Sequence, residues 1–245
     1  MKPIHRSLTA LALAIVSLMA CLPVPIGDPE KSQIDPELSG MWLMLGDDEP
    51  AVALFEPYDK RTWLISHFPI SVDEESCDWD DDVLVEGEDE DEVDYDFMVR
   101  FIEAHGADCF GADGVAHYKA WRTKLGGIWF MTWEPKGVYD EDFGFATELW
   151  YGWRIDKAGS DYFSLMIIDA DYDGFDELED YQEIADLKPP YDPRKLRSAR
   201  RAVERVIRKN KDDEDLYGGN AFEFSRVRPE HFDLFKGTIT SLRPD

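Results

Sequence analysis

The segment Thr147–Ile155 reads TELWYGWRI, and its side chains alternate as those of a β-strand do. Glu148 and Arg154 fall on one face, and four apolar residues share the other: Leu149, Tyr151, Trp153 and Ile155. Both this segment and Ile128–Trp133, which reads IWFMTW, also carry large side chains on their second face. We therefore expect two central strands, each covered on both sides.

Seven more segments have the composition of short strands, being rich in aromatic and β-branched residues and bounded by Gly, Asp and Pro. They are Met41–Gly46, Ala51–Glu56, Thr62–Phe68, Phe97–Glu103, Val115–Arg122, Tyr162–Ile168 and Ala221–Val227. Consecutive short strands without intervening helices indicate an antiparallel arrangement. The sequence predicts a mainly β fold over residues 40–245. It is either a meander closed into a barrel or an open sheet or sandwich.

The domain opens with Gly40-Met41-Trp42, and a strand meander follows. This opening resembles that of lipocalin-type β-barrels, in which a Trp on the first strand closes the barrel floor. The resemblance implies a barrel with Trp42 at one end. The alternative is that Trp42 is a plain core residue.

A helical insert is predicted over residues 175–211, near the C-terminal end. Phe175–Leu187 has apolar residues at helical spacing, and Asp192 followed by Pro193 is typical of a helix start. The second helix, which ends near residue 209, has an apolar face and a strongly basic one. Its basic face either pairs with the chain's own acidic loop, contacts anionic lipid or glycan, or is simply solvated; we favour neutralisation within the chain or by solvent.

The first 20 residues are typical of an export signal, with Lys2 and Arg6 before an uncharged apolar run. The run ends in Leu18-Met19-Ala20-Cys21, which resembles the lipobox of bacterial lipoproteins. The resemblance implies cleavage before Cys21, acylation of Cys21 with chains such as palmitate, and, because Leu22 follows, sorting to the outer membrane of a Gram-negative envelope, facing either the periplasm or the outside. The alternative is an ordinary secreted protein cut near Ala20. Residues 21–39 hold four prolines and are predicted to be a lipidated tether.

The chain is acidic, with 53 Asp and Glu against 26 Lys and Arg among 245 residues and a formal net charge of -27. Nucleic acid is therefore not expected as a partner, because phosphates would be repelled over most of the surface. The acidic residues concentrate at 72–96, a predicted solvated loop that is alternatively a surface for cations or a basic protein partner. Hydrophobic residues make up 44% of the chain, so a packed core must exist.

With Cys21 acylated, the two remaining cysteines are Cys77 and Cys109. An even pair in an oxidising compartment favours a disulfide. The alternatives are two buried free thiols or a metal site shared with His105.

The segment Asp169–Asp180 contains Asp-Ala-Asp-Tyr-Asp-Gly and resembles the calcium loop of EF-hand and related proteins. The resemblance implies calcium as a cofactor, held by Asp169, Asp171, Asp173, the Phe175 carbonyl and Asp180. Three features depart from the family: Asp176 replaces an apolar residue, Asp180 replaces Glu, and a predicted strand precedes the loop. The alternative is a polar turn after a strand, in which Asp176 caps the next helix.

The common catalytic motifs for nucleophilic Ser, phosphate binding and zinc are absent from the sequence. The expected function is therefore a non-catalytic, lipid-anchored envelope module that binds a ligand or a partner. The aromatic strands would line a ligand site or form plain core. The alternatives are an envelope hydrolase that uses acidic residues and a calcium-binding protein.

Overall fold

The computed structural model describes residues 21–45, 50–70, 94–105, 115–139, 150–157, 159–176, 178 and 192–241. Its strands are β1 (Cys21–Leu22), β2 (Gly40–Leu45), β3 (Ala51–Pro57), β4 (Trp63–Pro69), β5 (Val115–Leu125), β6 (Ile128–Tyr139), β7 (Trp150–Lys157), β8 (Tyr162–Ile168) and β9 (Tyr217–Arg226). Its α-helices are α2 (Tyr95–His105), α3 (Asp173–Asp176), α5 (Pro193–Asn210) and α6 (Phe232–Ser241). Short 3-10 helices lie at Pro29–Lys31, Pro36–Leu38, Glu214–Leu216 and Pro229–His231.

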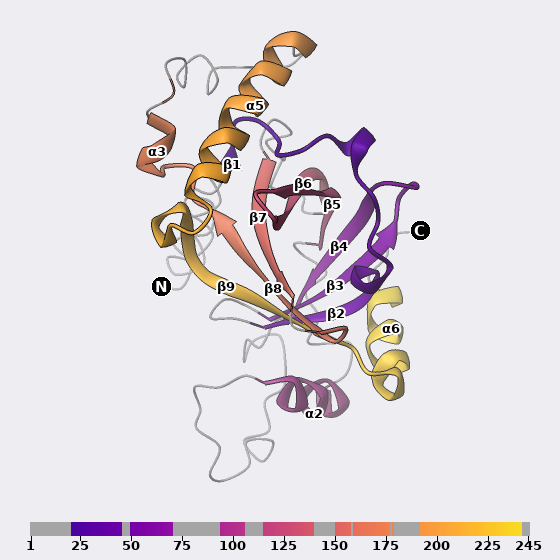
Figure 1. The fold of residues 1–245 in the computed structure, drawn as a ribbon. Coiled ribbons are helices and arrows are strands. Elements are labelled where there is room, and N and C mark those ends of the chain that lie inside the picture. The colour runs from indigo at the N-terminus through magenta and orange to yellow at the C-terminus, as the bar shows by residue number, and fades with distance from the viewer. Residues whose placement is uncertain are drawn as a thin grey trace, which may run out of the picture.

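The sheet is antiparallel throughout, in the order β1-β7-β6-β5-β4-β3-β2-β9-β8, and β8 pairs again with β7. This last pairing closes β2–β9 into an eight-stranded barrel (Figure 1). The prediction of a mainly β antiparallel fold is confirmed, and the barrel is the form that it takes. The two-residue β1 lies beside β7, where Cys21 is opposite Tyr151.

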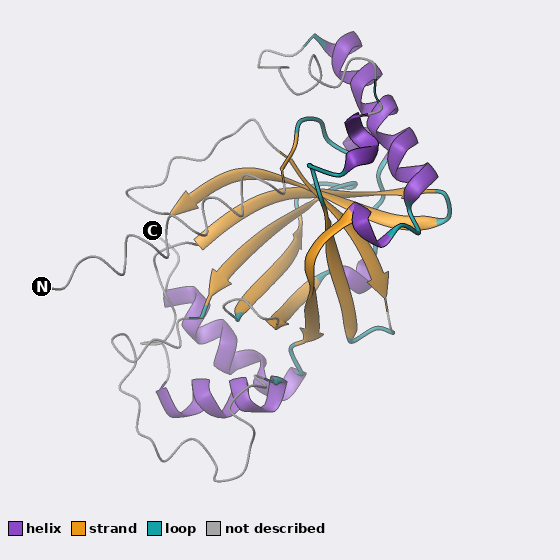
Figure 2. Ribbon diagram, turned by 90° about the vertical axis from the view of Figure 1, so that its left-hand side faces the viewer, coloured by secondary structure: helices purple, strands orange, loops and turns teal. Residues whose placement is uncertain are grey.

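Alternation along the strands creates one interior and two outer apolar clusters. The interior contains Trp42, Phe55, Trp63, Phe163 and Phe224, all fully buried. One outer cluster joins α2 and α6 to the outside of β2–β4, and the other joins α5 and residues 22–26 to β6 and β8. As a result, α5 and the α2–α6 pair cover opposite ends of the molecule (Figure 2).

The segment Phe97–Glu103 was expected to be a strand, and this prediction is wrong. It lies within helix α2, where Met98, Phe101 and Ile102 are fully buried, at spacings of three and four residues. The Asp94 carboxylate accepts a hydrogen bond from the Phe97 amide at 2.7 Å and begins the helix. The apolar residues at 97, 99 and 101 fit a strand as well as this helical spacing. Burial against the barrel favours the helix over the strand.

Residues 21–39 were expected to be a tether, but residues 22–38 pack against the barrel. Leu22, Val24 and Ile26 are fully buried beside α5. Further along, Leu38 enters the interior cluster, and its carbonyl accepts a hydrogen bond from Trp42 Nε1 at 2.9 Å. The prolines therefore belong to an ordered strip of chain that covers one end of the interior.

Helix α5 is confirmed, with Asp192 accepting hydrogen bonds from the amides of Arg194 and Lys195. The other predicted helix, Phe175–Leu187, is described only as far as α3 and residue 178. The export signal and nearly all of the acidic loop lie outside the described residues. Of that loop only residues 94–96 are described.

Candidate functional site

Five aromatic side chains form a connected group on the inner face of the barrel, and we call them the aromatic cluster: Tyr118, Trp133, Tyr151, Trp153 and Phe222. The two indole rings are 5.1 Å apart between centroids. Tyr118 lies 5.2 Å from Trp133, and Phe222 lies 5.5 Å from Trp153. These separations are typical of aromatic pairs in contact.

The cluster is built by register. Trp133 of β6 lies opposite Tyr151 of β7, and Trp153 lies opposite Met131 on one side and Ile167 of β8 on the other. Side chains alternate along a strand, so residues two positions apart point to the same face. Three members of the cluster are each two positions from a buried residue that faces the interior: Tyr118 from Ala120, Tyr151 from Trp153, and Phe222 from Phe224. The three rings are nevertheless only half-buried.

The rest of the interior is different. Phe163 and Phe224 stack with centroids 4.5 Å apart, Trp42 meets Phe163 edge-on at 4.6 Å, and all three are fully buried. The barrel is thus filled at the end that Leu38 covers. Among the described residues, the rings of this inner cluster that keep partial exposure are Tyr118, Tyr151 and Phe222.

Trp153 carries a buried polar group in the cluster. The residue is 7% exposed, and its buried Nε1–H has no hydrogen-bond acceptor within the described part of the chain. By contrast, the indole N–H of Trp42, Trp63 and Trp121 donates to an oxygen at 2.9, 3.2 and 2.8 Å, respectively. A buried donor without a partner costs about 1–3 kcal/mol. A ligand atom that accepts this bond would recover that energy.

His67 stands on the same face of β4 as Trp63 and Ile65, so strand alternation directs it toward the interior. Its side chain keeps partial exposure, yet enough protein surrounds the ring that burial lowers its pKa to about 4. His67 is therefore neutral at physiological pH. No charge is added to the inner face at this position.

The predicted calcium loop is described only up to residue 178, so Asp180 lies outside. Asp169 Oδ1 accepts a hydrogen bond from the Asp171 amide at 2.9 Å, which is the bond of an Asx turn. Asp173 begins the short helix α3, and Phe175 is buried. Among the described residues no group of three or more His, Cys, Asp and Glu is placed to hold a metal ion. Calcium binding stays a prediction.

The cysteine predictions also remain untested. Cys77 and Cys109 both lie outside the described residues. Cys21 is described through its backbone, which pairs with Tyr151 in the sheet. In the ranges that the structure describes, no helix has the length and apolar character to span a bilayer.

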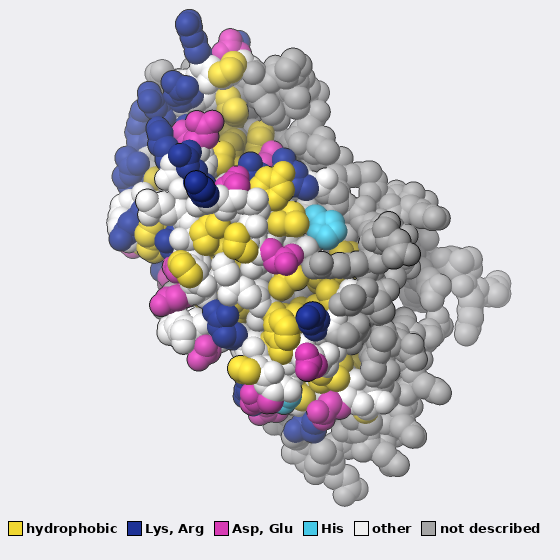
Figure 3. Space-filling view, turned by 90° about the vertical axis from the view of Figure 1, so that its right-hand side faces the viewer, with side chains coloured by type: hydrophobic (Ala, Val, Ile, Leu, Met, Phe, Trp, Pro, Cys, Tyr) yellow, Lys and Arg dark blue, Asp and Glu magenta, His cyan; other side chains and the backbone are white. Residues whose placement is uncertain are grey.

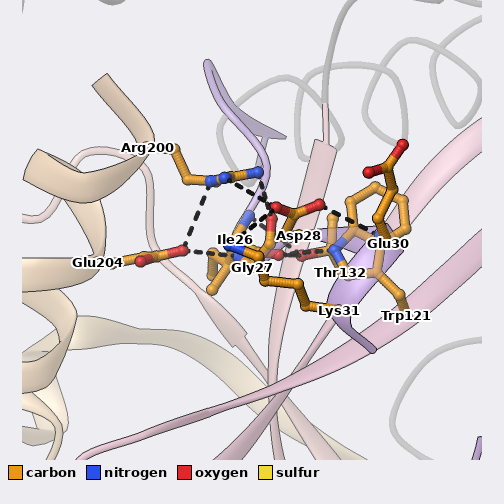
Figure 4. A network of polar contacts seen from close by, with 9 residues as sticks. All are labelled: Ile26, Gly27, Asp28, Glu30, Lys31, Trp121, Thr132, Arg200 and Glu204. Carbon is orange, nitrogen blue, oxygen red and sulfur yellow. Dashed lines mark hydrogen bonds and ion pairs between the residues drawn. The ribbon is translucent and has the colours of Figure 1, made fainter. Parts of the chain in front are cut away.

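The segment that follows Cys21 forms a polar clasp that sequence reasoning missed (Figure 4). Thr132 Oγ1 accepts a hydrogen bond from the Ile26 amide at 3.2 Å and donates to the Ile26 carbonyl at 2.7 Å. From α5, Glu204 accepts from the Gly27 amide at 2.9 Å and Arg200 donates to the Gly27 carbonyl at 3.0 Å. Apolar residues at every second position, 22, 24 and 26, were the signal that could have revealed this segment.

Gly27 is required at the centre of the clasp. Its φ is +73°, and a Cβ here would lie 2.6 Å from Thr123 Cβ. Only glycine meets both conditions without displacing β5.

Comparison of the chain with protein-family models, with curated proteins and with solved structures found no match.

Proposed function

We propose that this protein is a lipid-anchored envelope protein whose barrel is a non-catalytic binding module. The ligand class is a small, largely apolar molecule that carries a hydrogen-bond acceptor. The observation that supports the ligand class is the buried Trp153 Nε1–H, which has no acceptor among the described residues and lies beside the half-buried rings of Tyr151 and Phe222. The anchor rests on the lipobox-like sequence that ends in Cys21.

The chemistry of the cluster explains the choice of ligand. Aromatic faces offer apolar area and stacking, and each contact of this kind contributes about 0.5–1.5 kcal/mol beyond its buried area. Trp153 supplies a donor in a fixed position, which would orient the ligand rather than hold it alone. No side chain of the aromatic cluster bears a charge at neutral pH, so this site favours a neutral group.

An envelope hydrolase remains the alternative. It needs carboxyl groups that converge beside a bound substrate. The aromatic cluster contains none, and no described feature favours hydrolysis over binding.

The test uses prodan, a neutral naphthalene that carries a carbonyl acceptor and whose fluorescence reports the polarity around it. We expect prodan to bind, and Trp153→Phe to weaken its Kd about 5- to 10-fold, as for the loss of one hydrogen bond. Trp129→Phe is the control, because Trp129 is 38% exposed and lies under Arg122, outside the cluster.

A second probe, 2-dimethylaminonaphthalene, lacks the carbonyl and should bind wild type and Trp153→Phe equally. Equal loss of both probes would mean that the variant disturbs packing and not the hydrogen bond. If prodan fails to bind the wild-type protein, or binds both proteins with the same Kd, the proposed site is wrong.

A further inference from the structure

We infer that the exposed face of α5 is a membrane contact, in which a row of arginines binds the anionic phosphates of phospholipid headgroups. This inference deepens the proposed function, because it rests on the anchor at Cys21 for bringing α5 close to a bilayer.

The row has five members, and we call it the arginine row: Arg194, Arg197, Arg201, Arg205 and Arg208. Steps of three and four residues place all five on one side of the helix, opposite the buried Ala199, Val203 and Ile207. All five are exposed. From Arg194 to Arg208 the row covers 15 residues, a distance of about 21 Å at the rise of an α-helix. Figure 3 shows Lys and Arg side chains gathered over the part of the surface where α5 lies.

None of the five forms an ion pair within the part of the chain that the structure describes. The one acid of α5, Glu204, accepts a hydrogen bond from the Gly27 amide and pairs with Arg200. Arg200 is also separate: its side chain is 16% exposed and it pairs with Asp28 and Glu204. The helix therefore sorts its six arginines into one structural residue, Arg200, and the exposed row.

The position of the N-terminal segment favours a membrane as the partner. Residues 22–28 run from Cys21 directly against α5, joined by the buried Leu22, Val24 and Ile26 and by the clasp at Gly27. Figure 1 shows β1 beside α5. Acyl chains on Cys21 would thus enter a bilayer next to this helix, whereas α2 and α6 lie at the far end of the molecule.

The chemistry matches phosphate. The planar guanidinium group donates two parallel hydrogen bonds to a phosphate and keeps its charge at all physiological pH values. Each basic residue close to an anionic bilayer raises binding about fivefold. No Phe, Trp or Tyr lies within α5, so the contact would be electrostatic and reversible by salt. With a net charge of -27, the rest of the chain would be repelled, which orients the protein by this face.

The experiment measures partition of the full chain into vesicles of phosphatidylcholine alone and of phosphatidylcholine with 30 mol% phosphatidylglycerol. It uses a Cys21→Ala background, so that no acyl chain contributes. We expect phosphatidylglycerol to increase the partition coefficient. Replacing Arg197, Arg201 and Arg205 together by Gln should reduce that increase by on the order of a hundredfold. In 0.5 M salt, phosphatidylglycerol should no longer increase the partition coefficient of the protein with an intact arginine row. Gln keeps good helix propensity, so α5 itself should persist.

The control removes three cations that lie outside α5: Lys60→Gln, Lys119→Gln and Lys136→Gln together. It should leave the increase within about twofold of the parent. Equal losses in the row variant and the control, or no loss in the row variant, would overturn the inference. It would also be overturned if vesicle-free sedimentation shows a dimer that only the row variant loses, because α5 would then bind a second copy.

The anchor is tested separately by palmitate labelling of the wild type against Cys21→Ala. If the wild type is labelled but the arginine-row variant binds phosphatidylglycerol vesicles as the parent does, the inference is wrong and the proposed anchor stands. If the wild type is not labelled but its vesicle binding still depends on the arginine row, the proposed anchor is wrong and the membrane contact stands.

Discussion

Replacing His67 by Gln should make the stability of the protein less sensitive to acid. Burial lowers the pKa of His67 to about 4 in the folded protein, from 6.5 for an ordinary histidine. The folded state thus resists protonation at this ring, while the unfolded chain takes up a proton below pH 6.5. The free energy of unfolding must then fall as the pH drops from about 6.5 to about 4.

The size of the effect follows from the difference between the two pKa values. A difference of about 2.5 pKa units corresponds to about 3 kcal/mol, lost with a maximal slope of about 1.4 kcal/mol per pH unit. Above pH 6.5 the ring is neutral in both states, so His67 contributes nothing to the pH dependence there. Gln carries no titrating group and should remove this component entirely.

The assay is urea denaturation followed by tryptophan fluorescence, run on both proteins at several pH values from 7.5 to 4. Because the variant keeps all 53 acidic residues, their titration cancels in the difference between the two curves. The difference in free energy of unfolding between the two proteins should be constant above pH 6.5. Below pH 6.5 the wild type should lose more stability than the variant. Two curves that stay parallel down to pH 4 would refute the placement of a neutral His67 toward the barrel interior.

Three other outcomes are expected. Ile26→Ala should lower the free energy of unfolding by about 2–5 kcal/mol, because Ile26 is fully buried. A change below about 0.5 kcal/mol in urea denaturation would instead support the tether predicted from the sequence. Arg200→Met should lower the free energy of unfolding by several times more than Arg197→Met, which should stay within about 0.5 kcal/mol, because Arg200 binds the buried Gly27 carbonyl whereas Arg197 is exposed; equal effects would contradict the clasp. If the predicted loop binds calcium, millimolar calcium should raise the Tm, and Asp173→Asn should abolish the rise; no rise in the wild type would exclude the site.

The strands could be predicted because a period of two leaves a clear trace in the sequence. Thr147–Ile155 alternates over nine residues, and the same pattern places Tyr151 and Trp153 on the inner face of the barrel. Closure and the aromatic contacts could not be predicted, since they depend on which strands become neighbours. The error at Phe97–Glu103 has the same origin: seven residues fit two periods, and the choice was made by the barrel surface against which α2 packs.

The clasp could not be predicted from the sequence for a different reason. Leu22, Val24 and Ile26 alternate over only five residues, between prolines that are equally typical of a linker. Their burial is decided by β6 and α5, which lie about a hundred or more residues further along the chain. A local pattern this short gains meaning only from contacts over such distances.

Order in this segment changes what an anchor at Cys21 would do. A tether would let the barrel turn freely above the membrane. In the structure the Cys21 backbone is instead paired with Tyr151, a member of the aromatic cluster, and the next residues are fixed beneath α5. Anchoring at Cys21 would therefore hold the candidate ligand site and the arginine row at a set orientation to the bilayer. The clasp is the element that couples them, because the bonds of Gly27 to Arg200 and Glu204 join the N-terminal segment to the helix that carries the row.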